Sequence, residues 1–177
     1  MIKHFSVLLL IVCCFLSAST AQTHVDNGFI VKVGDKAPDF STKLTNGKTF
    51  KLSEHRGKII MLQFTASWCS VCRKEMPFIE NDIWLKLKDK KFTLIGLDRD
   101  EPMDVALAFE KQMKISYPLG LDPGADIFGL YALKTSGVTR NVIIDEHGKI
   151  IFLSRLFEIQ EFNTMKDVIF QAVKRLE

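Results

Sequence analysis

The 177-residue sequence contains few of the residues that dominate disordered, fibrous or disulfide-stapled proteins. It has 10 glycines, 5 prolines and 4 cysteines, and it holds no internal repeat or low-complexity segment. Apolar residues make up 47% and charged residues 25%, as in an ordinary soluble domain. The composition therefore excludes a collagen-like repeat, a disordered chain and a small disulfide scaffold, and it predicts one domain with its own hydrophobic core.

An excess of charge of one sign is also lacking. The 24 Lys and Arg residues are nearly balanced by 21 Asp and Glu residues, which leaves a formal net charge of +3. No basic stripe interleaved with aromatic side chains is present, so the electrostatic footprint of a nucleic-acid-binding protein is missing. We therefore expect no nucleic-acid partner.

Long hydrophobic runs are absent, and the longest apolar stretch lies at the N-terminus. Lys3 and His4 precede a mostly apolar segment at 5–16, and small residues follow it up to Ala21. A membrane-spanning helix needs ~20 apolar residues, whereas a basic start, a shorter apolar run and a small-residue end are typical of a secretory signal peptide. The sequence therefore predicts export, with cleavage after Ala21.

This cleavage divides the chain into a signal peptide at 1–21, a leader at 22–32 and one domain at 33–177. Neither Cys13 nor Cys14 follows the small residue that a lipoprotein signal requires, so we expect no lipid anchor. The predicted location is outside the cytoplasm, in a bacterial periplasm. Membrane attachment is expected only if the signal segment is not cleaved.

Cysteine is scarce, and removal of the signal peptide leaves only Cys69 and Cys72, which form a single CxxC motif. The histidines of the mature chain stand singly, so no second pair of ligands completes a structural zinc site. In an exported protein, a lone CxxC at the start of a helix is typical of a redox dithiol. We therefore expect chemistry at the sulfur atoms, with no metal and no cofactor.

Apolar periodicity predicts strands that alternate with helices. Runs of strand length at 58–64 and 92–97 each precede a helical pattern, at 70–88 and 102–114 respectively. This order implies parallel strands joined by a right-handed crossover. Pro77 lies inside the first helix and should bend it.

Shorter elements complete the predicted fold. Asn46-Gly47 between alternating residues is a strong hairpin signal. The Pro- and Gly-bearing stretch SYPLGLDPG, at 116–124, is assigned no helix or strand. The remaining predicted elements are a short helix at 125–133, two hairpin strands at 142–144 and 149–153, and a closing amphipathic helix at 160–176.

The position of the CxxC favours an ionised cysteine. Unpaired backbone N–H groups and the helix dipole stabilise negative charge at the N-terminus of a helix, so a thiolate is favoured at Cys69. Cys72 lies one turn later, faces Cys69 and can close a disulfide with it. We predict that Cys69 is the attacking nucleophile and Cys72 the resolving thiol.

The segment FTASWCSVCRKEMP resembles the active site of thioredoxin-like proteins. GDKAPDF, LTNGKTF, RGKIIMLQF and NVIIDEHGKI resemble the exported TlpA and ResA branch, which is related to the AhpC/TSA redoxin domain, and the resemblance covers about 33–176. It implies an α/β fold: a thioredoxin-like mixed β-sheet flanked by helices, with the CxxC helix and the final helix on opposite faces, and an N-terminal β-hairpin. It also implies protein disulfide or dithiol clients and an upstream thiol electron donor.

The same resemblance gives Glu75 a catalytic role. Glu75 occupies the position at which ResA-like proteins have a glutamate near the active site, where it would accept or shuttle the proton of the dithiol. Gln63 stands in place of the buried aspartate of thioredoxins, which shifts that role toward Glu75. The alternative is a solvated glutamate that merely complements the helix dipole.

Three further residues are predicted to bind substrate. Trp68 adjoins Cys69 and either shapes a docking surface or only shields the disulfide. Thr139 occupies the position of the family's cis-proline, and a trans peptide bond is expected there because a non-proline cis bond costs ~3–4 kcal/mol. Arg140 follows it at the mouth of the site, where it would stabilise the Cys69 thiolate, unless it points to solvent.

Two other functions stay open beside an exported thiol-disulfide oxidoreductase. A peroxiredoxin-like peroxidase is suggested by the redoxin resemblance and by Arg140, but the PxxxTxxC pattern is missing, since Thr65 lies four residues before Cys69. A dithiol module for metal or haem maturation is the other alternative, because soft thiolates suit Cu(I).

An acidic group, Asp98, Asp100 and Glu101, follows the strand predicted at 92–97. It lacks the regular oxygen-ligand spacing and the glycine of an EF-hand calcium loop. We therefore expect a solvated connection between a strand and a helix.

Overall fold

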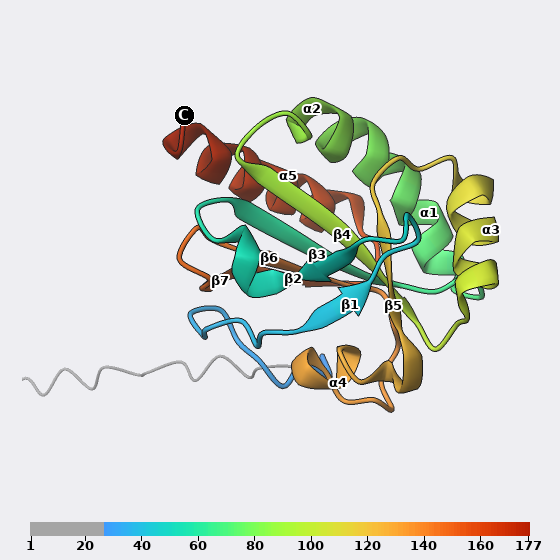
Figure 1. The fold of residues 1–177 in the computed structure, drawn as a ribbon. Helices are drawn as coiled ribbons and strands as arrows, with labels where there is room; N and C mark the ends of the chain where they lie inside the picture. The colour runs from blue at the N-terminus through green and yellow to red at the C-terminus, as the bar shows by residue number, and fades with distance from the viewer. Residues whose placement is uncertain (1–26) are drawn as a thin grey trace, which may run out of the picture.

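The computed structural model describes residues 27–177 of the chain (Figure 1). The predicted signal peptide at 1–21 and the first part of the predicted leader, 22–26, lie outside the described residues. Within 27–177, no helix combines the length and the apolar character needed to cross a bilayer.

A mixed sheet of five strands forms the centre of the domain. Its strands are β3 (Ile59–Thr65), β4 (Phe92–Arg99), β5 (Leu119–Asp122), β6 (Arg140–Ile144) and β7 (Ile150–Arg155). They are ordered β5-β4-β3-β6-β7 across the sheet. β3, β4 and β5 run parallel, whereas β6 pairs antiparallel with both β3 and β7. The predicted mixed sheet is therefore confirmed.

The predicted N-terminal hairpin is formed by β1 (Ser41–Lys43) and β2 (Thr49–Lys51). Gly47 closes its turn with a φ of +80°, a conformation that glycine adopts without steric cost. The backbone N–H of Thr45 donates to the carbonyl of Leu119 at 2.8 Å. The hairpin is thereby attached to the outer edge of β5.

The strand β5 is a departure from the sequence-based prediction, which places neither helix nor strand at 116–124. Gly120 lies within it, and a Cβ added there would lie 2.7 Å from Cγ2 of Thr42 in the hairpin. The hairpin approaches this strand so closely that a side chain would collide with it. Gly120, which made this segment look unlike a strand in the sequence, is thus required by the close packing of the hairpin against β5.

Three helical segments cover one face of the sheet. The CxxC helix α1 (Ser70–Phe78) continues through a π-helical segment, Ile79–Trp84, into α2 (Leu85–Leu87). Pro77 lies inside α1, two residues before the π-helical segment begins. The other two segments are α3 (Met103–Met113) and α5 (Ile159–Arg175).

The expectation that the CxxC helix and the final helix lie on opposite faces is wrong. Met76 of α1 and Met165 of α5 belong to one cluster of buried side chains, together with Met61 of β3. Figure 1 likewise shows α1, α2 and α5 on the same side of the sheet. The apolar stripe of α5 has no free surface on the other side, because that face is already covered.

The second face is covered by the hairpin, the segment before it and α4 (Phe128–Tyr131), which is shorter than the helix predicted at 125–133. The ring of Phe64 in β3 packs edge-on against Phe128 and at a tilt against Tyr131, with centroid distances of 5.4 and 5.5 Å. Short 3-10 turns at Leu52–His55 and Pro123–Ala125 link these parts. Side chains that alternate along β3 therefore enter two separate cores.

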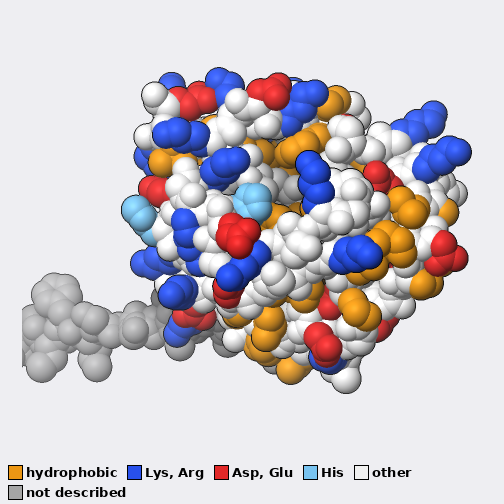
Figure 2. Space-filling model, in the orientation of Figure 1, with side chains coloured by type: hydrophobic (Ala, Val, Ile, Leu, Met, Phe, Trp, Pro, Cys, Tyr) orange, Lys and Arg blue, Asp and Glu red, His pale blue; other side chains and the backbone are white. Residues whose placement is uncertain are grey.

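The topology brings three chain segments to one end of the sheet. The parallel strands β3 and β4 end side by side, where Thr65 pairs with Asp98, and the antiparallel strand β6 begins there, where Arg140 pairs with Phe64. The CxxC turn, the loop after β4 and the loop before β6 thus meet at this end. On the face seen in Figure 2, Lys and Arg side chains are interspersed with Asp and Glu, in keeping with the small net charge.

Candidate active site

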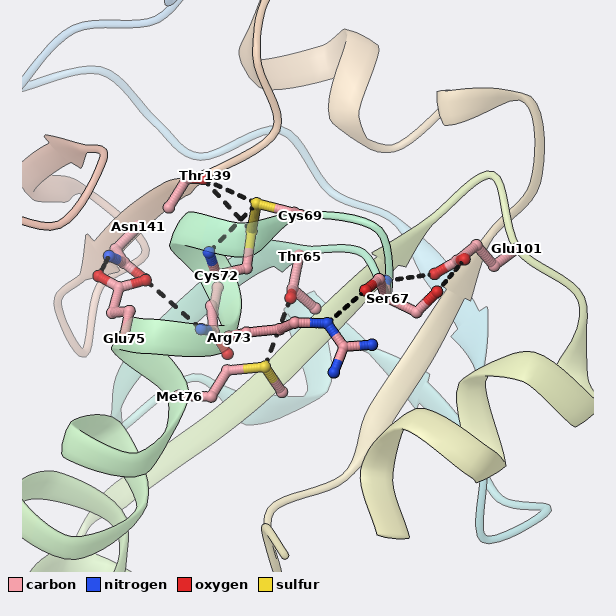
Figure 3. The surroundings of a disulfide bond; sticks show 11 residues. Thr65, Ser67, Cys69, Cys72, Arg73, Glu75, Met76, Glu101, Thr139 and Asn141 are labelled. Atoms are coloured by element: carbon pink, nitrogen blue, oxygen red, sulfur yellow. Dashed lines mark hydrogen bonds between the residues drawn. A yellow bond between two sulfur atoms is a disulfide. The ribbon is translucent and has the colours of Figure 1, made fainter. Parts of the chain in front are cut away.

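Cys69 and Cys72 are joined by a disulfide at the start of α1 (Figure 3). Cys69 is the N-cap residue of the helix, and its sulfur accepts a hydrogen bond from the backbone N–H of Cys72 at 3.2 Å. Cys69 is 7% exposed and Cys72 is fully buried. In the reduced protein the same N–H and the helix N-terminus would stabilise a thiolate at Cys69, so the sequence-based geometry of the CxxC is confirmed.

Thr139, the last residue before β6, lies against the disulfide. Its hydroxyl oxygen is 3.1 Å from the sulfur of Cys69 and 3.3 Å from the sulfur of Cys72. All peptide bonds within 27–177 are trans, including the one before Thr139. The resemblance implies a proline ring at this position, but a hydroxyl lies there, and it can donate a hydrogen bond to either sulfur.

Glu75 lies on α1, one turn after Cys72, and is only 1% exposed. The side-chain amide of Asn141 donates to its carboxyl at 2.7 Å, and that of Gln63 donates at 3.5 Å (Figure 3 shows the first contact). Burial raises the pKa of Glu75 to about 7, although the two hydrogen bonds oppose the increase. The alternative of a solvated glutamate is wrong.

The network around Glu75 reaches deeper than the sequence indicates. The hydroxyl of the fully buried Tyr117 donates to the side-chain oxygen of Gln63 at 2.8 Å. Asn141 also donates to the hydroxyl of Ser154 at 3.1 Å. The signal that could have found Asn141 is its place in β6, two residues after Thr139, where a strand turns its side chain to the same face.

The structure does not place Arg140 at either expected position. Its side chain is fully buried on the opposite face of the sheet from Asn141, because successive residues of a strand alternate. The guanidinium donates to the carbonyl of Asn27 at 2.6 Å and lies over the rings of Phe29 and Phe128. Burial, together with the charges of Arg155 and Arg99, lowers its pKa to about 10.

Trp68 is 62% exposed beside the nearly buried Cys69. It presents an exposed aromatic side chain one residue before Cys69, where a partner molecule can contact it. The exposure of Trp68 suits a role in docking, and that role stays a prediction.

The acidic group is only partly solvated, contrary to expectation. Asp100 is exposed, but Asp98 is fully buried. The carboxylate of Glu101 accepts from the backbone N–H of Ser67 at 2.6 Å and from its hydroxyl at 2.5 Å (Figure 3). Arg73 of α1 donates to the carbonyl of Ser67 at 2.6 Å. The loop after β4 is thus bonded to the turn that carries the CxxC.

Comparison with known proteins agrees with this arrangement. The sequence profile of the Redoxin family matches residues 32–169. The chain is 31% identical over 145 residues to a thiol-disulfide oxidoreductase ResA of Bacillus cereus, and the match covers 82% of each chain.

Two solved structures extend the comparison. The solution structure of a proposed protein disulfide isomerase from Bacteroides thetaiotaomicron matches with a TM-score of 0.81 at 59% identity, over 83% of this chain and 93% of that one. A proposed thiol:disulfide interchange protein DsbE from Chlorobium tepidum matches with a TM-score of 0.70 at 29% identity, over 81% of this chain and 99% of that one. The chain therefore belongs to the Redoxin family and, within it, to the thiol-disulfide oxidoreductases related to ResA.

Proposed function

We propose that this oxidoreductase exchanges disulfides with exported client proteins, with Cys69 as the attacking sulfur and Cys72 as the resolving one. The observation that supports these roles is that the two sulfur atoms have different environments. Cys69 is the more accessible of the pair, and its sulfur accepts a hydrogen bond from the backbone N–H of Cys72. A client disulfide can reach Cys69, whereas the fully buried Cys72 can react only with Cys69.

The reaction then runs in two balanced steps. The Cys69 thiolate attacks one sulfur of a client disulfide, a mixed disulfide forms and a client thiolate leaves. Cys72 then loses its proton and attacks the Cys69 sulfur, which releases the second client thiolate and restores the enzyme disulfide. The client gains two electrons from the enzyme. An upstream thiol donor must then supply two electrons to reduce the enzyme disulfide again.

Glu75 is the proposed acceptor of the Cys72 proton. The carboxyl lies one helical turn from Cys72, and its pKa of about 7 matches proton transfer near neutral pH. Hydrogen bonds from Asn141 and Gln63 fix its orientation.

The proposed client-contact surface consists of Trp68 and Thr139. Trp68 is exposed next to Cys69, and Thr139 touches both sulfurs. Arg140 is not included, because it would have to leave its buried position between two aromatic rings to reach a client.

The first prediction concerns the reaction class. The mature protein should accelerate the reduction of insulin disulfides by dithiothreitol, measured by turbidity, because the dithiol is intact. It should not accelerate the loss of hydrogen peroxide. Rapid peroxide turnover without insulin reduction would favour the peroxidase, and retention of Cu(I) or haem without insulin reduction would favour the maturation module.

The second prediction concerns the roles of the two cysteines. Cys72→Ser should accumulate mixed disulfides with clients on non-reducing gels, because attack proceeds and resolution does not. Cys69→Ser should accumulate none. Equal trapping by both variants would contradict the assignment.

A companion variant tests client contact within the trapping experiment. Trp68→Ala, added to Cys72→Ser, should lower the yield of mixed disulfides. Leu107→Ala is the matched control, since Leu107 is an exposed apolar residue of α3. An equal loss in both variants would remove Trp68 from the proposed surface.

The third prediction concerns Glu75. In the wild type, release of the client from the mixed disulfide should accelerate as pH rises through about 7, because the carboxylate is the form that accepts a proton. Glu75→Gln should lose this inflection and release clients up to ~10²-fold more slowly. Stopped-flow measurement of release between pH 5.5 and 8.5 gives both quantities.

Stability provides the control for Glu75→Gln. Because folding raises the pKa of Glu75 above its usual 4.5, this group favours the folded state at low pH, and that contribution is lost as pH rises through about 7. The Gln variant should therefore be no less stable than the wild type at pH 8 in urea unfolding. A destabilised variant with unchanged release kinetics would make Glu75 a structural residue.

The fourth prediction concerns export. We propose that residues 1–21 direct the protein to the bacterial periplasm and are removed there, on the evidence of the basic, apolar and small-residue pattern. Mass spectrometry of the periplasmic protein should find Gln22 as the N-terminal residue. A chain that keeps Met1 and sediments with membranes would instead indicate an anchor.

A further inference from the structure

A second buried carboxyl lies beside the CxxC turn. Asp98 is at the end of β4, paired with Thr65 at the end of β3, and it is fully buried. Within 27–177, no N–H or hydroxyl group donates to either of its carboxyl oxygens. The group in hydrogen-bonding contact with it is the carboxyl of Glu101. A buried carboxylate needs hydrogen-bond donors, but the neighbour of Asp98 is another carboxyl, whose oxygens are acceptors when it is ionised.

Glu101 is in the opposite situation. Its carboxylate accepts two hydrogen bonds from Ser67, and the positive charge of Arg73 lies near it. Two carboxyls in contact cannot both be ionised at little cost, so they share one proton. The distribution of donors assigns the proton to Asp98 and the negative charge to Glu101.

The ionisation of the two groups follows this assignment. Burial, and then the contact with Glu101, raises the pKa of Asp98 to about 8. Burial also acts to raise the pKa of Glu101, but hydrogen bonds from Asp98 and Ser67 and the charge of Arg73 outweigh it and lower that pKa below its usual range. The pair thus carries one negative charge at neutral pH.

The pair is bonded to the segment that presents the nucleophile. Ser67 lies two residues before Cys69, in the turn that joins β3 to α1 (Figure 3). The same turn is closed by the backbone N–H of Cys69, which donates to the carbonyl of Ala66 at 3.1 Å. The two hydrogen bonds that Ser67 donates to Glu101 therefore restrain the backbone that leads into Cys69.

We propose that Asp98 is a positioning residue of thiol-disulfide exchange: as the neutral acid it donates a hydrogen bond to Glu101, and Glu101 holds the turn at Ser67 that presents Cys69. When Asp98 loses its proton, two adjacent carboxylates repel each other and the hold on Ser67 weakens. The inference takes from the proposed function only the role of Cys69 as the attacking sulfur.

The other charged groups around the pair do not change this assignment. From α1, Arg73 faces Glu101 and also donates to Gln112 of α3. From α3, Asp104 lines a small cavity together with Ser67 and Arg73. The β3 neighbour of Asp98 is Thr65 and the β5 neighbour is Leu121, and neither carries a charge. Arg99, which follows Asp98 in β4, donates to the carbonyls of Ser136 and Lys134, whereas the charge of Arg73 acts on Glu101.

The first experiment follows the backbone amide proton of Ser67 by NMR between pH 5 and 9.5. The oxidised protein is used, because disulfide-bonded cysteines do not titrate. In the wild type the Ser67 resonance should shift with an inflection near pH 8. Asp98→Asn, whose amide remains a neutral donor, should abolish this inflection. Asp100→Asn is the matched control at an exposed neighbour and should keep it, as should Glu75→Gln.

A second variant tests the contact between the two carboxyls. Glu101→Gln keeps an oxygen for Ser67 and offers Asp98 an amide donor in place of a like charge. The titration of Asp98, followed by its carboxyl ¹³C resonance, should therefore move to lower pH. An unmoved titration, or a Ser67 resonance that is flat above pH 7 in the wild type, would overturn the proposal.

The kinetic readout is the rate at which dithiothreitol reduces the enzyme disulfide. Asp98→Leu, which has no donor, should be about tenfold slower at pH 7, because displacement of the turn misplaces the reacting sulfur. Asp98→Asn should retain the wild-type rate within about twofold. Equal rates in all three proteins would show that the pair does not position Cys69.

The two proposals fail in different ways. If the insulin assay is negative while the Ser67 titration is as expected, the proposed function is wrong and the coupling of the pair to the turn stands. If insulin is reduced but Ser67 does not titrate with Asp98, the positioning role is wrong and the function stands. An Asp98→Leu protein that does not fold leaves the Asn and Gln variants to decide.

Discussion

The site depends on one constraint: the central strand β3 must end beneath a helix that begins at Cys69. A strand that is buried on both faces cannot move without disturbing two cores, so the turn at its end has a fixed origin. The helix that follows directs its unpaired N–H groups at the first sulfur. The groups that come from other parts of the chain are placed beside this junction, after β4 on one side and at the start of β6 on the other.

Two buried carboxyls flank this junction, and their neighbours give them different properties. Glu75 receives amide donors from Gln63 and Asn141, which oppose the effect of burial, so its pKa rises only to about 7. Asp98 meets another carboxyl and is supplied with no donor from the residues described. Similar burial thus yields one group suited to proton transfer and one suited to structural support, because hydrogen-bonding partners decide which protonation state is favoured.

Much of the fold could be predicted from the sequence, because strands and helices have apolar patterns of different length and spacing, and these patterns give their order along the chain. The CxxC, its helix and the hairpin at Asn46-Gly47 follow from local patterns. The strand β5 could not be predicted, since Gly120 serves a contact with a hairpin far earlier in the chain. The face on which α5 packs also escaped prediction, because it depends on which face the remaining elements leave free.

In the candidate site, too, features that depend on neighbours in sequence could be predicted, and features that depend on distant residues could not. The proposed role of Cys69 follows from its position at the start of a helix, whereas that of Glu75 follows from the resemblance to ResA-like proteins. The burial of Arg140 follows from its facing the aromatic rings of Phe29 and Phe128, and no residue near it in sequence reveals them. Asp98 resembles any charged residue in a polar loop until β3 and β5 are placed beside it. The environments of Arg140 and Asp98 depend on contacts between distant parts of the chain, and a single sequence does not reveal these contacts.

The attachment of the β1-β2 hairpin to β5 has a consequence for recognition. Thr45 and Thr42 occupy the carbonyls of Leu119 and Leu121 on the outer side of the edge strand. That edge therefore has no free ladder to offer an extended polypeptide, which blocks both strand addition by a client and edge-to-edge aggregation. A polypeptide that pairs as an added strand would therefore have to bind elsewhere than along this border of the sheet.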